Sequence, residues 1–491
     1  MDRRNFIKNG GLLAAGGGIL FGGGQGCTTG APNGTDSSQT KIGAPRLASA
    51  FTGIPGEKRI RIVETNANFE REGLIRPFGF KGGAMREIWQ TAALLGSEAG
   101  HRKFGLCTQN VLWSDPAVFE VHSESASNAL MYAVTTRALQ MIKGQAFHNP
   151  VQLQEDILDE LWEYGQHITG NADLKETFIL NALVGIDNAA WLLYCAENEI
   201  SNFDDMVPLA YRNSLSEHHG KVAGIPLMAY NIPVQEIKEA VDAGYFFMKI
   251  KIGQAGTQEE MVQKDMARLS EIHKAIGGAH TSYTESGKLP YYFDANGRYE
   301  EKETMLRFLD HARKIGAFDQ IAIIEEPFAE EKKFPVGDLG VRIVSDETAH
   351  TDKHALERIQ MGYTAIALKP IAKTMSMSMK VAQLAYEHRI PCFCADLTVN
   401  PILVEWNKVV AARLGAFPGV KGSLGLVESN GHQNYSNWNE MLSYNPAANG
   451  SWAKVEKGVY NLNEDYYRQS GGIFEQSPHY ATWFPAEPSA H

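Results

Sequence analysis

Cysteine is scarce in this sequence, and the few cysteines are not spaced to bind a metal. The 491 residues include five cysteines, which form no Cys-x-x-Cys pair and no pattern with closely spaced histidines. A structural zinc site is therefore not expected. Cys392 and Cys394 flank Phe393 in a run with the pattern of a β-strand, where alternate side chains share a face. That geometry disfavours a disulfide between them, so we predict two buried core thiols.

A concentrated basic face is also missing. The formal net charge is −11 and the isoelectric point is near 5.8. Binding to nucleic acid needs clustered lysine and arginine side chains for the phosphates, so this class of protein is excluded. The sequence contains no repeat of the solenoid type either. With 44% hydrophobic residues, a chain of this length forms a large core, and we expect two domains and a small-molecule substrate.

The first residues have the layout of an export signal. Arg3 and Arg4 are followed by Phe6 and Lys8, and residues 10–21 form a short, glycine-rich apolar run. This run is too short to span a membrane comfortably. We predict that residues 1–27 are a twin-arginine signal, which the twin-arginine export machinery would recognise, and that the protein is exported to the periplasm.

Cys27, at the end of this signal, is a candidate for lipid attachment. Gly26 before it is small, as a bacterial lipobox requires, but the usual aliphatic residue three positions before the cysteine is absent. A membrane-anchored lipoprotein and a free periplasmic protein both remain open. Residues 28–45 are rich in Gly, Ser, Thr, Asn and Pro, which predicts a flexible linker.

Two kinds of periodicity divide the rest of the chain. Residues 46–224 begin with an alternating strand and continue with long amphipathic helices, such as 174–196, which predicts an α+β domain. From 225 to 431, short apolar strands alternate with amphipathic helices, which is the pattern of a parallel β/α barrel. Residues 432–491 show no clear repeat and are expected to pack back on the first domain. Residues 277–290 are polar and turn-rich, which predicts an inserted loop on the amino-terminal side of the barrel.

Charged residues end successive apolar runs in the second of these regions. The carboxyl ends of barrel strands converge on one pocket, so we expect these side chains to meet. The acids among them offer three oxygen ligands, which suits Mg²⁺ or Mn²⁺. In chain order the residues are Lys251, Asp294, Glu325, Asp346 and Lys369.

Three lysines are candidates for proton transfer. Lys249 and Lys251 are two residues apart and share one face of a strand. Two close ammonium groups lower each other's pKa, which would provide a neutral amine as a general base. Lys369 is expected to face Lys251 across the pocket. Two bases on opposite sides of one carbon can remove a proton and return it on the other side, which inverts a stereocentre.

The order of these motifs resembles the enolase superfamily, and within it the muconate-lactonizing-enzyme-like subgroup of the mandelate racemase/muconate lactonizing enzyme family. The resemblance covers roughly residues 174–427 and implies a TIM-like (β/α)7β barrel with an α+β capping domain formed by the N-terminal region and the C-terminal tail. The matching motifs are Lys249-Ile-Lys251, Asp294-Ala-Asn296, Ile324-Glu-Glu-Pro327, Ser345-Asp-Glu-Thr348 and Leu368-Lys-Pro370.

The resemblance also implies a reaction. A substrate carboxylate would bind the metal, and Lys251 or Lys369 would remove the proton on the α-carbon to give an enediolate, with Lys249 assisting Lys251. We interpret the chain as an isomerase, a racemase or epimerase of an amino-acid-like or dipeptide-like substrate. A lyase, either a dehydratase or a cycloisomerase of a sugar acid, is the alternative, and a non-catalytic periplasmic binding protein is a third. A homo-oligomer is common among similar proteins.

Substrate recognition departs from one branch of the family. Dipeptide epimerases of this subgroup carry Asp-x-Asp at the end of the eighth strand, and the corresponding stretch, 420–428, has no such pair. Asp396 and Glu428 are the remaining candidates to bind a substrate ammonium group. Glu326 and Glu347, each beside a metal ligand, are expected to point to the opposite side of their strands.

The capping domain usually supplies a specificity loop. Residues 76–85 are the expected loop, because their glycines permit movement. Phe78 and Phe80 can cover an apolar part of a ligand, and Lys81 is a candidate to bind a second carboxylate.

Overall fold

A computed structural model of the chain describes residues 57–81 and 83–485. The predicted signal segment (1–27), the linker (28–45) and the candidate lipidation site at Cys27 all lie outside the described residues. Their roles therefore stay predictions from the sequence.

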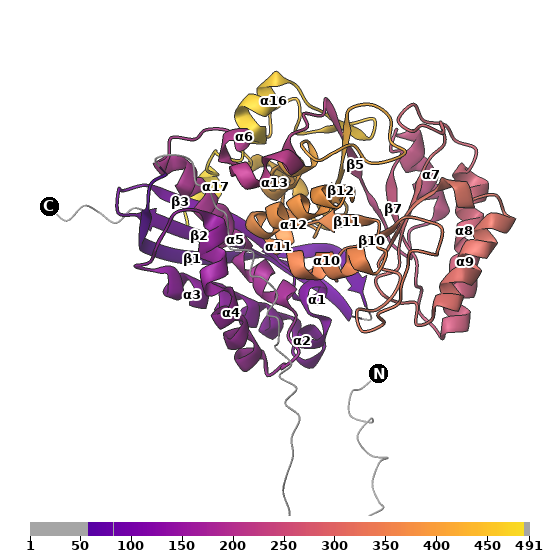
Figure 1. Cartoon of the computed structure of the whole chain (residues 1–491), viewed down its shortest axis with the longest axis horizontal. Coiled ribbons are helices and arrows are strands. Elements are labelled where there is room, and N and C mark those ends of the chain that lie inside the picture. The colour runs from indigo at the N-terminus through magenta and orange to yellow at the C-terminus, as the bar shows by residue number, and fades with distance from the viewer. Residues whose placement is uncertain (1–56, 82, 486–491) are drawn as a thin grey trace, which may run out of the picture. The chain divides into compact units, whose positions relative to one another are not determined.

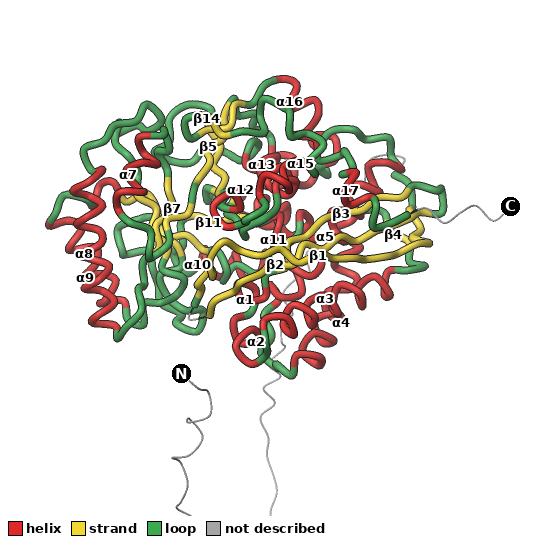
Figure 2. The backbone as a smooth tube through the Cα atoms, turned by 180° about the vertical axis from the view of Figure 1, so that it is seen from behind, coloured by secondary structure: helices red, strands yellow, loops and turns green. Residues whose placement is uncertain are grey.

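Three long antiparallel strands begin the described chain: β1 (Ile60–Phe80), β2 (Gly83–Ser97) and β3 (Arg102–Gln109). The sheet order is β3-β2-β1-β4, with the short β4 (Ala146–Phe147) at the outer edge. The alternating charged and apolar residues at the start of β1 form a strand with one buried face, as expected. Ile60 and Ile62 are buried, while Arg61 between them is exposed. Figure 2 shows β1 and β2 extending toward β7, the strand that carries Lys249 and Lys251.

Helix α5 is the centre of this first part of the structure (Figure 1). Its length and composition would suffice to cross a membrane, with a mean hydropathy of 1.4 over 18 residues, but that whole window is buried inside the protein. It is the core helix predicted at 174–196. The helices here are α1 (Val111–Ser114), α2 (Pro116–Val121), α3 (Glu124–Ile142), α4 (Pro150–Thr169), α5 (Glu176–Glu197), α6 (Phe203–Met206) and the 3₁₀ helix η1 (Leu209–Leu215).

Helix α4 shows how the sequence sets the ends of these helices. The side chain of Asn149 accepts a hydrogen bond from the backbone N–H of Gln152 at 2.9 Å, which satisfies a donor that has no partner within the helix. Pro150 occupies the first helical position, where its missing amide hydrogen costs nothing. The helix stops at Gly170, whose φ of +66° is readily adopted by glycine.

The second part of the structure is a curled parallel sheet. Its order is β14-β15-β5-β13-β12-β11-β10-β9-β8-β7-β6. Strand β5 (Lys221–Ile225) pairs in parallel with β13, whereas β6 (Leu227–Met228) pairs in parallel with β7. Only Pro226 separates β5 from β6, so the two ends of the run of parallel strands meet there. Pro226 lacks an amide hydrogen for the ladder, but its carbonyl accepts a bond from Lys249 N at 3.0 Å.

Helices alternate with these parallel strands, as the sequence pattern predicts. Figure 1 shows α8 and α9 side by side on the outside of the sheet. The strands are β7 (Met248–Lys251), β8 (Tyr291–Asp294), β9 (Ile321–Glu325), β10 (Ile343–Ser345), β11 (Ala365–Leu368), β12 (Cys392–Cys394) and β13 (Leu424–Glu428). The helices are α7 (Val234–Asp242), α8 (Gln258–Ile276), α9 (Lys302–Lys314), the 3₁₀ helix η2 (Phe318–Gln320), α10 (Asp352–Gln360), α11 (Pro370–Lys373), α12 (Met375–Glu387) and α13 (Pro401–Ala411).

Two local predictions are confirmed in this sheet. Cys392 and Cys394 are buried, free thiols on β12. The polar segment 277–290 joins the end of α8 to the start of β8, so it lies at the amino ends of the strands.

The C-terminal segment contacts both parts of the structure. Tyr435 accepts a hydrogen bond from Gln90 of β2 at 2.8 Å, and the Phe484 ring lies 5.8 Å from that of Phe104 on β3. Strand β15 (Val459–Asn461) pairs antiparallel with β5 and extends the parallel sheet, which the sequence pattern does not predict. The remaining elements are α14 (Gly431–Asn434), α15 (Trp438–Ser443), β14 (Val455–Glu456), α16 (Glu464–Gln469), η3 (Ser470–Gly472) and α17 (Pro478–Ala481).

The contact between β3 and α5 depends on glycine and gives a test of the fold. A Cβ atom on Gly105 would lie 2.3 Å from the carbonyl oxygen of Gly185 and 2.4 Å from the amide nitrogen of Ala189, both in α5. We therefore expect Gly105→Ala to push the helix from the sheet and to lower the free energy of unfolding by about 1–3 kcal/mol. Gly73→Ala on β1 is the matched control, because no atom lies within 4 Å of its added Cβ. Equal denaturation midpoints for the two variants would contradict this packing.

Candidate active site

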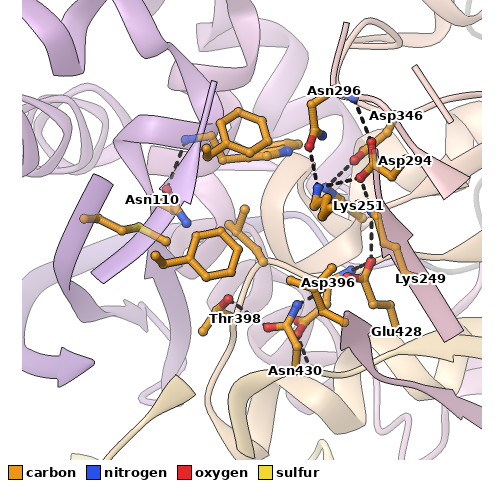
Figure 3. A pocket seen from close by; sticks show the side chains of 17 residues that line it. Asn110, Lys249, Lys251, Asp294, Asn296, Asp346, Asp396, Thr398, Glu428 and Asn430 are labelled. Atoms are coloured by element: carbon orange, nitrogen blue, oxygen red, sulfur yellow. Dashed lines mark hydrogen bonds and ion pairs between the residues drawn. The ribbon is translucent and has the colours of Figure 1, made fainter. Parts of the chain in front are cut away.

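The carboxyl ends of the parallel strands bring the predicted residues together, as Figure 3 shows for the labelled side chains. Lys249 and Lys251 lie on β7, Asp294 ends β8, and Asp346 and Lys369 directly follow β10 and β11. Of all the predicted site residues, only Glu325 and Lys81 do not line this cavity. Those that do are Phe78, Phe80, Lys249, Lys251, Asp294, Asp346, Lys369, Asp396 and Glu428.

Lys249 is the most highly connected charge of the site. Its Nζ lies 2.9 Å from Asp294, 2.8 Å from Glu325 and 3.3 Å from Glu428. Burial lowers the pKa of Lys249, but the charges of these three carboxylates raise it well above its ordinary value. The expected lowering of its pKa by Lys251 is therefore wrong, because carboxylates rather than the second ammonium group dominate its surroundings.

Lys251 is held by two oxygens. Its Nζ donates to Asp294 Oδ2 at 2.6 Å and to Asn296 Oδ1 at 2.5 Å, and it lies 5.6 Å from the centre of the Phe80 ring. Burial raises the pKa of Asp294, but the charges of Lys249 and Lys251 hold it below its ordinary value. Asp294 is thus an ionised acceptor that orients Lys251.

Lys369 is held in a similar way from another strand. Its Nζ donates to Asp346 Oδ2 and lies 4.2 Å from the centre of the Trp113 ring. Burial lowers the pKa of Lys369, but the charges of Asp346, Glu325 and Glu347 together raise it above its ordinary value. In the sheet order, β8, β9 and β10 lie between the strands of Lys251 and Lys369. The two lysines therefore approach the pocket from separate directions.

Three acids form a buried cluster. One carboxylate oxygen each of Glu325, Asp346 and Glu347 lie within 4.8 Å of one another. Glu325 also accepts a hydrogen bond from the hydroxyl of Tyr292. Within the described part of the chain, the buried Asp346 Oδ1 and Glu347 Oε2 have no hydrogen-bond partner.

The position of Glu347 differs from the prediction. Alternation along a strand predicts that it points away from Asp346, but β10 ends at Ser345, so both acids lie in the turn that follows it. Glu326 stabilises this turn, because its Oε1 accepts bonds from Asp346 N at 2.6 Å and from Thr348 N at 3.1 Å.

This cluster fits a hard divalent cation. Carboxylate oxygens are the ligands that such ions prefer, and two of those in the cluster accept no hydrogen bond from the described residues. The predicted set of Asp294, Glu325 and Asp346 shares two members with the observed cluster. Asp294 lies outside the observed cluster; its Oδ2 contacts both lysines of β7 and its Oδ1 accepts a bond from Asn296 N at 2.9 Å.

Several turns around the site have strained backbones. Lys81, Asn296, Glu326 and Thr398 have φ angles between +41° and +58°, in the left-handed region that side chains other than glycine seldom adopt. Three of these residues follow the ends of β8, β9 and β12. Such conformations persist where surrounding contacts hold them, and they are common at functional sites.

The expected specificity loop is the end of a β-hairpin. Residues 76–85 belong mostly to β1 and β2, and the register of this strand pair shifts between Gly73 and Phe78. Phe78 and Phe80, the residues expected to cover a ligand, line the cavity. Lys81 forms an ion pair with Glu347 at 3.3 Å, so it joins the hairpin to the acid cluster.

A wider cleft adjoins the cavity. It has a volume of about 600 Å³ and shares Trp113 and Asn296 with the cavity. Lys175, Arg298 and Glu330 line it, so the cleft carries charges of both signs.

Comparison with known proteins supports this arrangement at the level of the fold. No model of a protein family matches the chain, and no curated protein sequence does. Solved structures do match. A mandelate racemase/muconate lactonizing protein from Herpetosiphon aurantiacus has a TM-score of 0.56 at 14% identity, over 82% of this chain and 96% of that one.

Two further matches have named activities. A dipeptide epimerase from Enterococcus faecalis V583, complexed with Mg and L-Leu-L-Tyr, has a TM-score of 0.52 at 16% identity, covering 75% of this chain and 90% of its own. An N-succinyl Arg/Lys racemase from Bacillus cereus ATCC 14579 has a TM-score of 0.55 at 16% identity, with coverages of 77% and 89%. The chain shares its fold with these three proteins and with a member of the enolase superfamily from Enterococcus faecalis V583. The resemblance seen in the sequence is confirmed to that extent.

Within this fold, Asp396 and Glu428 form a pair of acids from the ends of neighbouring strands. Asp396 Oδ2 accepts from Asn430 N at 2.8 Å, and Glu428 Oε2 accepts from Asp396 N at 3.1 Å. Burial, and then the charge of Glu428, raise the pKa of Asp396 to about 7. The pair lines the cavity at the position where a substrate cation was expected to bind.

Sequence reasoning missed the residues that helix α1 and its cap contribute. Asn110 and Trp113 line the cavity from the start of α1. Neither belongs to a motif, so only the folded arrangement identifies them. Lys373 was also missed; it donates to the carbonyl oxygens of Asp346 and Ala349 and fixes the turn that carries the acids.

Variants of the acid cluster test its fit to a cation. We expect Asp346→Asn and Glu347→Gln each to weaken Mn²⁺ binding by about tenfold or more, because each removes a charged oxygen ligand. Titration calorimetry measures the affinity. Glu330→Gln is the control, because that acid is paired with Lys175 at 2.6 Å and His350 at 2.9 Å outside the cluster. Unchanged binding in Glu347→Gln, with loss in Asp294→Asn, would favour the ligand set predicted from sequence.

Proposed function

We propose that the protein is a Mg²⁺-dependent racemase or epimerase that moves the proton on the carbon beside a substrate carboxylate. The curled sheet would be a (β/α)7β barrel, and the first sheet with its helices and the C-terminal segment would be its capping domain. The observation that carries the proposal is the pair of buried lysines, Lys251 and Lys369, which reach one cavity from separated strands beside a cluster of acids.

The two lysines are positioned for proton transfer before a substrate binds. Asp294 and Asn296 orient Lys251, whereas Asp346 and the Trp113 ring orient Lys369. Holding each amine in one geometry reduces the entropy that must be lost in the reaction. One lysine would remove the proton from one side of the carbon, and the other would return a proton from the opposite side.

Lys249 has a different role in this proposal. Its contacts with three carboxylates favour its protonated form, so it would balance charge and hold Asp294 in place rather than exchange a proton with the substrate. This assignment revises the expectation that Lys249 acts beside Lys251 as a base.

Glu325 and Asp346 would hold the cation, with Glu347 or Asp294 as the next ligand. When bound, Mg²⁺ supplies positive charge that attracts the substrate carboxylate and makes the α-proton more acidic. The dipeptide epimerases from Enterococcus faecalis V583 and Cytophaga hutchinsonii, which share the fold, were solved as complexes with Mg. Phe78 and Phe80, which line the cavity, would exclude water from the reacting carbon.

The substrate would be amino-acid-like. Asp396 and Glu428 place two acids in the cavity, and a substrate ammonium group is the natural partner for them. The similar folds of dipeptide epimerases and an N-succinyl Arg/Lys racemase support this class.

We also propose a location and an assembly from the sequence alone. The twin-arginine signal would export the folded protein to the periplasm, with Cys27 as the candidate for lipid attachment. The active form would be a homo-oligomer.

Single-lysine variants provide the test of the two-base reaction. Lys251→Met and Lys369→Met are each expected to lose roughly 10²–10⁴-fold in racemisation, because each lacks one of the two proton carriers. In D₂O, each variant should still exchange the α-proton of one substrate stereoisomer, and the two variants should prefer opposite isomers. Nuclear magnetic resonance with each pure isomer measures this exchange.

Lys238→Met is the matched control, because Lys238 is a surface lysine of α7 paired with Asp242. It should retain full turnover. Full turnover by Lys251→Met or Lys369→Met would refute the two-base reaction, and release of water from the substrate would identify a lyase instead.

The pH dependence of substrate binding tests the role of Asp396. The pKa of about 7 means that this acid loses its charge as the pH falls below 7. The KM for a substrate with a free ammonium group should therefore fall as the pH rises through 7, and Asp396→Asn should remove this dependence and raise KM about tenfold. An N-acylated substrate is the control. Equal effects on both substrates would contradict an ammonium site at Asp396.

A further inference from the structure

A second cavity lies at the end of the parallel strands opposite the candidate active site. Its volume is about 400 Å³, within the range of roughly 300–1,000 Å³ that is usual for sites of small molecules. It is bounded by residues at the starts of β9 and β10, by the loop before β8 and by the turn before β13. These residues include Leu289, Pro290, Ile321, Arg342 and Val420.

Part of the wall of this cavity is apolar. Phe247, Leu289 and Ile321 line the cavity, with Pro418 and Val420 from the turn before β13. Such a wall favours a ligand with an apolar body, because binding removes apolar surface from water.

Arg342 contributes a positive charge to this wall. Its buried Nε donates no hydrogen bond, and across residues 57–81 and 83–485 its guanidinium group has neither a hydrogen bond nor an ion pair. Its contact is the ring of Phe417, 5.2 Å from the centre of the guanidinium group. Burial lowers the pKa of Arg342. A partly buried guanidinium group is normally paired with an anion, so this one is available for a ligand.

Two exposed acids, Glu285 and Asp319, also line the cavity. Neither is paired with Arg342 among the described residues. They disfavour a ligand with two negative charges, such as a phosphate dianion, and they favour one that also carries a positive group.

We propose that this cavity is a second binding site, for an apolar α-amino acid in its zwitterionic form. Its carboxylate would bind the guanidinium group of Arg342 through two parallel hydrogen bonds. Its ammonium group would face Glu285 and Asp319, and its side chain would pack against Phe247 and Leu289. The site is separate from the lysines and acids of the candidate active site and does not depend on the function proposed for them.

Titration calorimetry with L-phenylalanine tests the site directly. The full chain is titrated in the presence of EDTA, so that a metal-dependent active site does not contribute. Arg342→Met should weaken binding by about tenfold or more, because it removes a charge-assisted pair of hydrogen bonds. Arg342→Lys should also weaken binding, since an ammonium group cannot form that planar pair. Both variants should fold, because the guanidinium group has no hydrogen bond or ion pair to lose and methionine keeps the apolar stem that packs near Phe417.

Arg468→Met is the control, since Arg468 is an exposed arginine of α16 paired with Asp465, and it should bind L-phenylalanine like the unchanged protein. Phenylacetate, which lacks the ammonium group, should bind more weakly than L-phenylalanine. Three results would overturn the proposal: no binding of L-phenylalanine, binding that Arg342→Met leaves unchanged, or preference for inorganic phosphate.

Discussion

The ion pairs of Lys249 hold the carboxyl ends of the central strands together. Lys249 is only 3% exposed, and its ammonium group lies between 2.8 and 3.3 Å from the carboxylates of Asp294, Glu325 and Glu428, which belong to three other strands. Without this charge, three acids would face one another with little water. Breaking a buried pair of this kind typically costs about 3–5 kcal/mol, because it leaves an uncompensated charge. The geometry of the whole site therefore depends on Lys249.

This arrangement gives the other lysines separate environments. Lys251 and Lys369 each contact one acid and one aromatic ring, Phe80 or Trp113, contributed by the other part of the chain. The aromatic rings limit access of water, while the single carboxylates set the direction of each amine. Closing the site thus requires both parts of the structure, and the ion pair between Lys81 and Glu347 links the hairpin end directly to the acid cluster.

The sequence could predict the fold class and most of the site for a physical reason. In an alternating strand and helix pattern, a charged residue that ends a buried apolar run is expected at the carboxyl end of a parallel strand. The sequence pattern alone could therefore assign residues such as Asp294 to that end of the sheet. Glu347 was misplaced because strand alternation stops where β10 ends. Trp113 was missed because no local pattern connects α1 to the lysines. The pKa of Lys249 was predicted in the wrong direction because it is set by three carboxylates that are far from Lys249 in the sequence but close in the fold. The spacing of residues near Lys249 does not reveal them.

The most direct measurement is a crystal structure with Mn²⁺ and a carboxylate substrate analogue, with the metal located by anomalous scattering. The account predicts a single peak within about 2.5 Å of oxygens of Glu325 and Asp346. It also predicts that the α-carbon of the analogue lies between the Nζ atoms of Lys251 and Lys369. A metal peak away from these acids, or both lysines on one side of the α-carbon, would contradict the account.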